Sequence, residues 1–283
     1  MSLATRRRAA TRTVLLDRSL EALPLFRLSD SADDGAVSVT TDEGGRWRVL
    51  AAPGDRLPGT FDQDVYVELM RRFHEAGAPP HGAVSFTLHA FLRSMGRRVD
   101  GRTYDQLRGA LTRLERTILE SQGAYYSAAA NAFVDARFPV LSAVLIERRR
   151  IVDQDQFQLF SAVQSAEPGE ARVVIAPQLR ENLLAGRTTA LLTTRYLALP
   201  SPVARRLYRL IEVARADDMV TWRIALDRLR EQLPLTQRYP SHLQRVLQPA
   251  HEMLVAAEIV RDAVFRQQGR EWFVDYVLAH RPT

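Results

Sequence analysis

The chain has 283 residues, of which 46% are hydrophobic and 25% charged, a composition typical of a folded protein that is long enough for two domains. It contains no cysteine, which excludes disulfides, thiol catalysis and cysteine-ligated zinc. All 39 basic residues are arginine, which excludes Walker A and Schiff-base lysines, while the net charge of +6 permits binding to nucleic acid.

Residues 1–45 are expected to form a basic arm and a short hairpin. Residues 1–20 are expected to be disordered, and the arginines of Thr5-Arg-Arg-Arg8 are not followed by the apolar stretch of a secretion signal. A hairpin is predicted to pair Val37–Val39 with Arg46–Leu50. No apolar run reaches the 18 residues of a membrane helix, so we expect a cytoplasmic protein without membrane contact.

Residues 46–180 are expected to form the first domain. Periodicity and turn residues predict, in order, a helix, a short strand, a second helix, a basic turn and a third helix, over Asp62–Ala76, Val84–Leu88, His89–Met95, Arg97–Thr103 and Tyr104–Thr117. Patterns rich in β-forming residues follow at 118–127, 133–148, 157–163 and 171–175. Residues 178–197 are expected to be helical, with a break near Gly186.

Residues 186–283 are expected to form the second domain, with the same order of elements. A helix begins at Ser201-Pro202, a strand covers Trp222–Leu226, and Asp227 is the expected N-cap of a helix over Arg228–Leu233. The next helix covers Arg238–His251 and should bend or end early at Pro249. A hairpin over 259–278 completes a winged helix-turn-helix.

The two domains resemble each other position by position. Val65, Leu69, Phe73, Phe86 and Leu88 each precede an apolar counterpart by 138 residues: Val203, Leu207, Ile211, Ile224 and Leu226. In the third helix the offset is 136, between Leu107 and Leu243 and between Leu111 and Leu247. We therefore predict an α+β fold of two tandem winged helix-turn-helix domains related by internal duplication.

The third helix of each domain is the candidate DNA-reading helix. The major groove admits one helix, held with its N-terminal residues toward the bases and its apolar face on the scaffold. The side chains expected to contact DNA lie on the polar faces of these helices and on the second hairpin: Arg102, Tyr104, Arg108, Thr112, Arg113, Arg238, Tyr239, Ser241, His242, Gln244, Arg245, Gln248, Arg266 and Arg270.

These residues lie in segments that resemble the replication initiator protein A family of plasmids. The resemblance is carried by Leu23-Pro-Leu-Phe26, Tyr104–Leu114, Leu199–Tyr208 and Tyr239–Ala250, and it covers most of residues 20–278. It implies a protein that binds repeated origin sites, helps to open an adjacent AT-rich segment and recruits host initiator and helicase proteins. It also implies no nicking, no ATP and no other cofactor. The resemblance further implies a stronger contact by the C-terminal winged helix, and a homodimer as an alternative to the DNA-binding monomer. Pro249 fits the family pattern.

Two other functions were weighed against this one. A tandem winged-helix transcriptional regulator would use the same residues to bind an operator. A nicking or strand-transfer enzyme would need a catalytic set, but the six histidines form neither HxH nor HExxH, and Tyr125-Tyr126 lacks a metal-binding histidine pair. We therefore expect no catalytic residues and no metal site.

Overall fold

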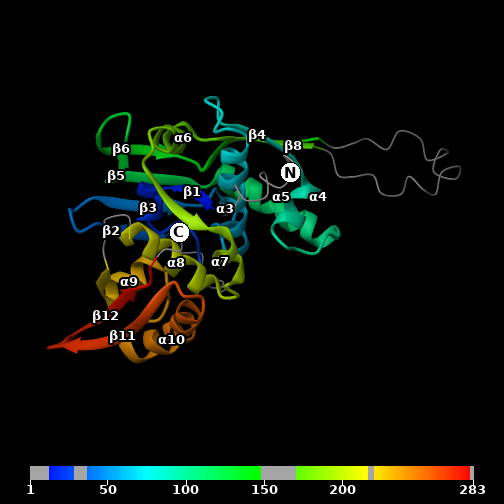
Figure 1. Cartoon of the computed structure of the whole chain (residues 1–283). Helices are drawn as coiled ribbons and strands as arrows, with labels where there is room; N and C mark the ends of the chain where they lie inside the picture. The colour runs from blue at the N-terminus through cyan, green and yellow to red at the C-terminus, as the bar shows by residue number, and fades with distance from the viewer. Residues whose placement is uncertain (1–12, 29–36, 148–169, 216–219, 281–283) are drawn as a thin grey trace, which may run out of the picture.

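The computed structural model describes residues 13–28, 37–147, 170–215 and 220–280 (Figure 1). Its first elements are strand β1 (Thr13–Asp17) and the single-turn helix α2 (Arg18–Glu21), which Asp17 caps by accepting a hydrogen bond from the backbone of Ser19. The expectation of disorder is therefore wrong for residues 13–20, while residues 1–12 and the predicted strand 157–163 lie outside the described part of the chain.

Strand β1 is ordered because it pairs with a strand that the sequence patterns did not reveal. β9 (Thr188–Leu192) runs antiparallel to β1 over all five residues, from Thr13 opposite Leu192 to Asp17 opposite Thr188. β9 lies between helices α6 (Pro177–Leu184) and α7 (Thr193–Ala198), so the predicted helix over 178–197 is wrong in its centre. The pairing joins the start of the chain to the segment between the two winged helices.

The first winged helix consists of α3 (Thr60–Glu75), β4 (Ala83–Thr87), α4 (Leu88–Ser94) and α5 (Gly101–Arg116), followed by the wing strands β7 (Leu141–Ile146) and β8 (Glu170–Ile175). The strand order in its sheet is β4-β8-β7. The helical spacing of Leu107, Leu111 and Leu114 buries one face of α5 completely.

A second sheet is inserted into this unit. It consists of β2 (Val37–Thr40), β3 (Arg46–Leu50), β5 (Ile118–Ser127) and β6 (Ala132–Phe138), in that spatial order. The predicted hairpin is confirmed as β2–β3, and a domain boundary at residue 45 would run through its turn. Trp47 is fully buried in this sheet and packs against the rings of Tyr125 and Phe138, which also contact each other.

The second winged helix consists of α8 (Pro202–Arg215), β10 (Thr221–Ala225), α9 (Leu226–Gln232), α10 (Pro240–Ala256) and the wing strands β11 (Val260–Gln268) and β12 (Glu271–Leu278). Ala225 occupies the N-cap of α9 and Asp227 lies inside its first turn, so the predicted cap is wrong by two residues. Helix α10 continues through Pro249 to Ala256 and does not end early.

The two units share one architecture, as an internal duplication requires. The sheet of the second winged helix has the order β10-β12-β11. It matches the order β4-β8-β7 in the first winged helix when the two wings are aligned. Paired positions of the sequence repeat are fully buried in both copies, including Leu69 with Leu207 and Leu107 with Leu243. The fold is therefore the predicted α+β arrangement of two tandem winged helices. None of the helices described is long and apolar enough to cross a membrane.

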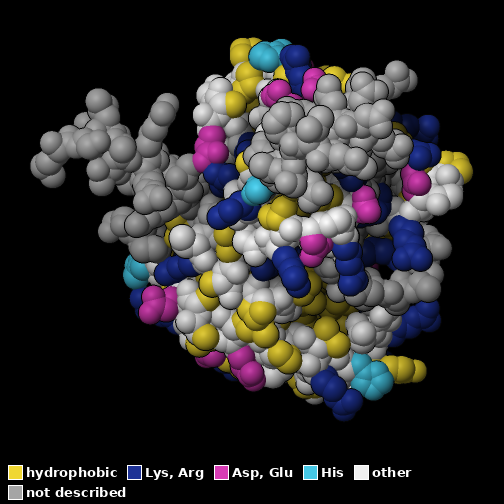
Figure 2. All heavy atoms as spheres, turned by 90° about the vertical axis from the view of Figure 1, so that its right-hand side faces the viewer, with side chains coloured by type: hydrophobic (Ala, Val, Ile, Leu, Met, Phe, Trp, Pro, Cys, Tyr) yellow, Lys and Arg dark blue, Asp and Glu magenta, His cyan; other side chains and the backbone are white. Residues whose placement is uncertain are grey.

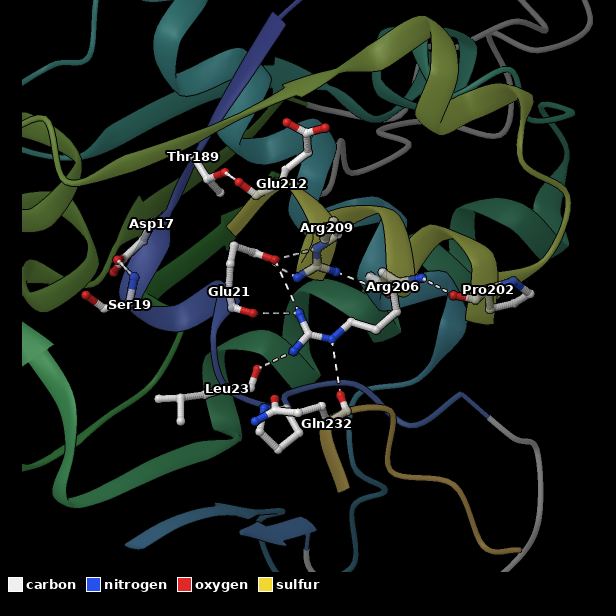
Figure 3. Close-up of polar contacts among 12 residues, drawn as sticks. Asp17, Ser19, Glu21, Leu23, Thr189, Pro202, Arg206, Arg209, Glu212 and Gln232 are labelled. Atoms are coloured by element: carbon white, nitrogen blue, oxygen red, sulfur yellow. Dashed lines mark hydrogen bonds and ion pairs between the residues drawn. The ribbon is translucent and has the colours of Figure 1, made fainter. Parts of the chain in front are cut away.

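The two units are joined by four buried polar side chains, three of them charged, which we name the Glu21 cluster: Glu21, Gln63, Arg206 and Arg209 (Figure 3). The Glu21 carboxylate accepts bonds of 2.7 and 2.9 Å from the Arg209 guanidinium, whose Nη1 also donates to Gln63 Oε1 of α3. Burial, and next the neighbouring Arg209, lower the pKa of Arg206 to about 9. That value leaves Arg206 charged at neutral pH, and although burial opposes it, the carboxylate of Glu21 raises the pKa of Arg209 above its ordinary value.

Arg206 acts mainly on backbone carbonyl groups. It donates to the carbonyl oxygens of Glu21 at 3.0 Å, Leu23 at 2.8 Å and Gln232 at 3.3 Å. These acceptors lie before the first winged helix and at the end of α9, so one side chain of α8 satisfies three carbonyl groups in two chain segments (Figure 3). The Glu21 cluster thus supports both units at once.

A second polar contact between the units centres on Asp64 of α3, which is 5% exposed. Its carboxylate accepts a bond from Arg97 at 2.7 Å, one from Tyr196 of α7 at 2.9 Å and one from Arg205 of α8. Arg97 belongs to the turn that precedes α5. The same carboxylate therefore holds this turn and the second unit against α3.

Candidate nucleic-acid interface

Helix α10 presents a polar face opposite its apolar one. Leu243, Leu247, Ala250 and Leu254 are buried on one side of the helix. The exposed side, with the two residues just before the helix, carries six of the seven side chains of this segment that were predicted to contact DNA: Arg238, Tyr239, Ser241, His242, Arg245 and Gln248. Tyr239 is 68% exposed and its ring packs edge-on against His242 at 5.7 Å. An exposed aromatic pair of this kind can contact bases or sugars.

The beginning of α10 is suited to an anion. Pro240 occupies the first turn, no side chain caps the helix, and no acidic residue lies in the first turn. Unpaired N–H groups and the helix dipole give such an end a partial positive charge. Arg238 and Arg245 are exposed, and no ion pair or hydrogen bond engages either guanidinium within the described ranges. Both are therefore available to phosphates or base edges.

The two glutamines of α10 differ in their surroundings. Gln248 is exposed and donates from Nε2 to Glu252 Oε1 at 3.0 Å, which orients its amide on the helix surface. Gln244 is half-buried, and its Nε2 is enclosed without a hydrogen-bond partner among the described atoms. Gln248 is thus the better placed of the two to contact DNA.

Helix α5, the equivalent helix of the first unit, is less open to an anion. Asp100 caps it by accepting from the backbone of Thr103, and the Thr103 hydroxyl accepts in return from the backbone of Asp100. Arg108 pairs with Asp105 at 3.0 Å on the helix surface. Arg102 and Thr112 are exposed, and Tyr104 packs partly buried against the core.

Arg113 of α5 pairs with an acidic residue of α3. Its guanidinium forms a bidentate pair with Asp62 of α3, with bonds of 2.8 and 2.7 Å, and the Asp62 side chain is 1% exposed. Hydrogen bonding to Asp62 raises the pKa of Arg113. This pair holds α5 on α3, and the contact of Arg113 with DNA stays a prediction.

Arg270, Arg266 and Arg223 lie on the second wing. Of these, Arg223 was not among the predicted DNA contacts. Arg270 lies in the two-residue turn between β11 and β12, where Gly269 adopts a φ of +63°. Arg266 pairs with Asp275 at 2.8 Å, and Arg223 of β10 approaches the same carboxylate at 3.4 Å. Arg223 was missed because β10 is distant in sequence from the wing, and only the strand pairing brings it there.

Figure 2 shows the side of the molecule on which α4 and α5 lie. Basic side chains are spread over this face, with acidic side chains between them, and no single basic patch covers it. On the segment that begins α10, Arg238 and Arg245 have no acidic partner among the described residues. Among the described residues, no group of three His, Asp or Glu side chains is arranged to hold a metal ion.

His251 lies on the buried side of α10 and links the helix to the wing. Its Nε2 lies 2.8 Å from the hydroxyl of Tyr276 on β12, and its ring packs against Phe265 of β11 at 5.1 Å. Burial lowers the pKa of His251 from 6.5 to about 4. The folded protein therefore keeps this imidazole neutral at a pH where the unfolded chain would protonate it.

This difference predicts a pH dependence of stability. The contribution of His251 is complete above pH 6.5 and is lost as the pH falls toward 4, because the unfolded state then binds more protons. Burial raises the pKa of Asp17 to about 7, so its contribution has the opposite slope in the same range. We therefore expect His251→Gln to lose less stability than the wild type between pH 7 and 4.5, measured by thermal unfolding. Equal pH slopes would contradict this account.

Comparison with known proteins agrees with this geometry. The model of the replication initiator protein A family matches residues 16–253. No curated protein matches the sequence.

Domains 2 and 3 of RctB superpose with a TM-score of 0.58 at 15% identity, over 94% of this chain and 100% of theirs. The Pi initiator protein in complex with iteron DNA gives 0.52 at 13% identity, over 96% and 99% of the two chains. These likenesses to solved structures concern the fold alone. Because the family model covers most of its length, the chain belongs to the replication initiator protein A family.

Proposed function

We propose that this protein acts in the cytoplasm as a sequence-specific initiator that binds repeated double-stranded sites at a replication origin. In this proposal, binding promotes opening of adjacent DNA and recruits host initiator and helicase proteins. A homodimer is proposed as a second state of the chain. The protein acts by binding and not by catalysis. We propose that the chain is divided into residues 1–45, 46–180 and 186–283. The main DNA contact belongs to residues 186–283.

The observation that carries the proposal is the state of helix α10. It combines an uncapped N-terminus, two exposed arginines without acidic partners and an exposed Tyr239–His242 pair on one helix face. The remaining proposed contacts are Ser241, Gln244, Gln248, Arg266 and Arg270 from the same unit, and Arg102, Tyr104, Arg108 and Thr112 from the first. The likeness to an initiator whose solved structure contains iteron DNA supports the same direction.

The proposal is tested by footprinting the purified protein on the DNA that surrounds its own gene. Evenly spaced, protected direct repeats next to an AT-rich tract would support an initiator. A single protected palindrome would instead favour a transcriptional regulator, the alternative function for a tandem winged helix.

Binding to the protected site should weaken steeply with salt. Each neutralised phosphate releases condensed counterions, so log Kobs should fall with log salt by about 0.9 per phosphate contact. A slope that corresponds to several phosphates is expected, measured by fluorescence anisotropy between low and moderate salt. A flat response would count against DNA binding as a whole.

A further inference from the structure

The outer face of the second wing carries three charged side chains from three different strands, which we name the wing cluster: Arg223, Asp275 and Arg266. Register places Arg223 directly opposite Asp275, and Arg266 lies diagonally from Asp275 on the other side of β12. Side chains alternate between the two faces of a strand, so this register brings all three to one face. Asp275 stands on the central strand, between the two arginines.

Asp275 forms an ion pair with the Nε atom of each arginine, and its buried Oδ1 has no hydrogen-bond partner among the described residues. Arg266 contacts Asp275 Oδ2 through Nε at 2.8 Å, and Arg223 contacts Oδ1 through Nε at 3.4 Å. Arg223 is fixed further by a bond of 2.9 Å from Nη2 to Gln268 Oε1 and by the ring of Phe273, 4.4 Å from its guanidinium carbon. Neither Nη atom of Arg266 forms an ion pair or hydrogen bond among the described residues, and this side chain is 62% exposed.

The terminal N–H groups of the two arginines differ in their engagement, because Arg223 Nη2 donates to Gln268 Oε1 whereas no bond from an Nη atom of Arg266 is found among the described residues. Contact through Nε leaves the far edge of a guanidinium, which carries the two Nη atoms, directed away from the carboxylate. Two arginines held in this way, one of them 49% and the other 62% exposed, form a pair of fixed donors close to the wing turn and Arg270. Fixed guanidinium donors are well matched to a phosphate, and holding them in place reduces the conformational entropy lost on binding.

We infer that Asp275 is a positioning residue that presents Arg223 and Arg266 as a phosphate-binding pair to the DNA backbone beside the site of α10. The inference rests on the proposed function, since it names the wing contact of that same DNA complex. It adds Arg223 and Asp275 to the interface. The unusual element is the carboxylate: an acid close to a phosphate opposes binding by charge, so its contribution must come from geometry.

Charge and positioning are expected to change the DNA affinity of an Asp275 variant in opposite directions, so an experiment can separate them. Asp275→Asn and Asp262→Asn each remove one negative charge from the same wing, and each would raise the net charge from +6 to +7. Asp262 is exposed on β11 and its side chain bonds only to the backbone of Ala263 at 2.9 Å in the described structure. Charge alone predicts that both variants bind the protected site more tightly. Positioning predicts that Asp275→Asn alone binds roughly three- to tenfold more weakly.

Further variants test whether Arg223 and Arg266 each contact a phosphate. They also keep the test valid if one variant does not fold. Arg223→Gln and Arg266→Gln should each weaken binding and reduce the salt slope by about 0.9, the value for one phosphate contact. Asp275→Asn combined with Arg223→Gln should lose less than the sum of the two single losses. Thermal unfolding checks that each variant folds, and the two arginine variants carry the test if Asp275→Asn does not.

Two outcomes overturn the inference. One is Asp275→Asn binding as tightly as Asp262→Asn, and the other is arginine variants whose salt slopes match the wild type. Failure of the proposed function looks different, because the wild-type protein itself would then show no salt-dependent binding to the DNA around its gene.

Discussion

Replacing Glu21 with glutamine is expected to lower the free energy of unfolding by about 3–5 kcal/mol, the range found when one partner of a buried ion pair is removed. Glutamine keeps the shape of the side chain, removes its charge and replaces one acceptor oxygen with a donor NH2 group. Arg206 and Arg209 would then remain buried, at 2% and 1% exposure, with no carboxylate between them. Desolvated like charges without a counter-ion are among the most destabilising changes that a single substitution can make.

Urea unfolding monitored by circular dichroism measures this loss. The control is Glu258→Gln, which removes the same group from an ion pair with Arg195 that is 3.7 Å long and whose acid is 83% exposed. That change should stay within about 0.5 kcal/mol, as for most surface substitutions. A Glu21→Gln variant as stable as the control would show that the Glu21 cluster contributes little to the fold.

The second large effect concerns DNA. Arg245→Ala is expected to weaken binding to the protected site by about 1–3 kcal/mol, the contribution of a good arginine contact to a base edge. The guanidinium projects from the exposed face of α10, one turn from the helix start, and no acidic side chain competes for it within the described residues. Base preference at one position of the site should relax together with the affinity.

Anisotropy titrations on the protected site and on random DNA of equal length measure both effects. Arg137→Ala is the control, because it removes the same charge from β6, outside the proposed contacts, where Glu120 already pairs with the guanidinium. It should change affinity less than Arg245→Ala does. An equal loss on specific and random DNA would reassign Arg245 as a phosphate contact.

The winged helices themselves could be predicted from local patterns. Stripes of leucine at helical spacing fixed the core faces of α5 and α10, and the burial of Leu107, Leu111, Leu243 and Leu247 confirms them. The strand β9 could not be predicted in this way. Five residues, Thr188–Leu192, are too short for periodicity to separate a strand from a helix, and the partner strand β1 lies some 170 residues earlier.

The same limit applies to charged residues. Sequence gives the type of a side chain but not the partner that arrives from a distant element. Arg113 was predicted as a DNA contact because it is a basic residue on the correct helix, and only the structure reveals Asp62 of α3 beside it. Arg206 and Arg209 would be expected at the surface of α8, yet both are buried because Glu21 reaches them from the start of the chain.

The position of Glu21 has a consequence for how the chain is made. Residues 13–21 leave the ribosome before the rest of the described chain, and their partners in β9 and α8 follow more than 160 residues later. Contacts of such long sequence separation form slowly, and a segment waiting for them exposes apolar groups such as Val14 and Leu16. The first winged helix should therefore complete its own core during synthesis and acquire its N-terminal strand only after the second unit emerges. A ribosome-stalled chain ending near residue 180 would then show protease cleavage within residues 13–26 that the finished protein resists.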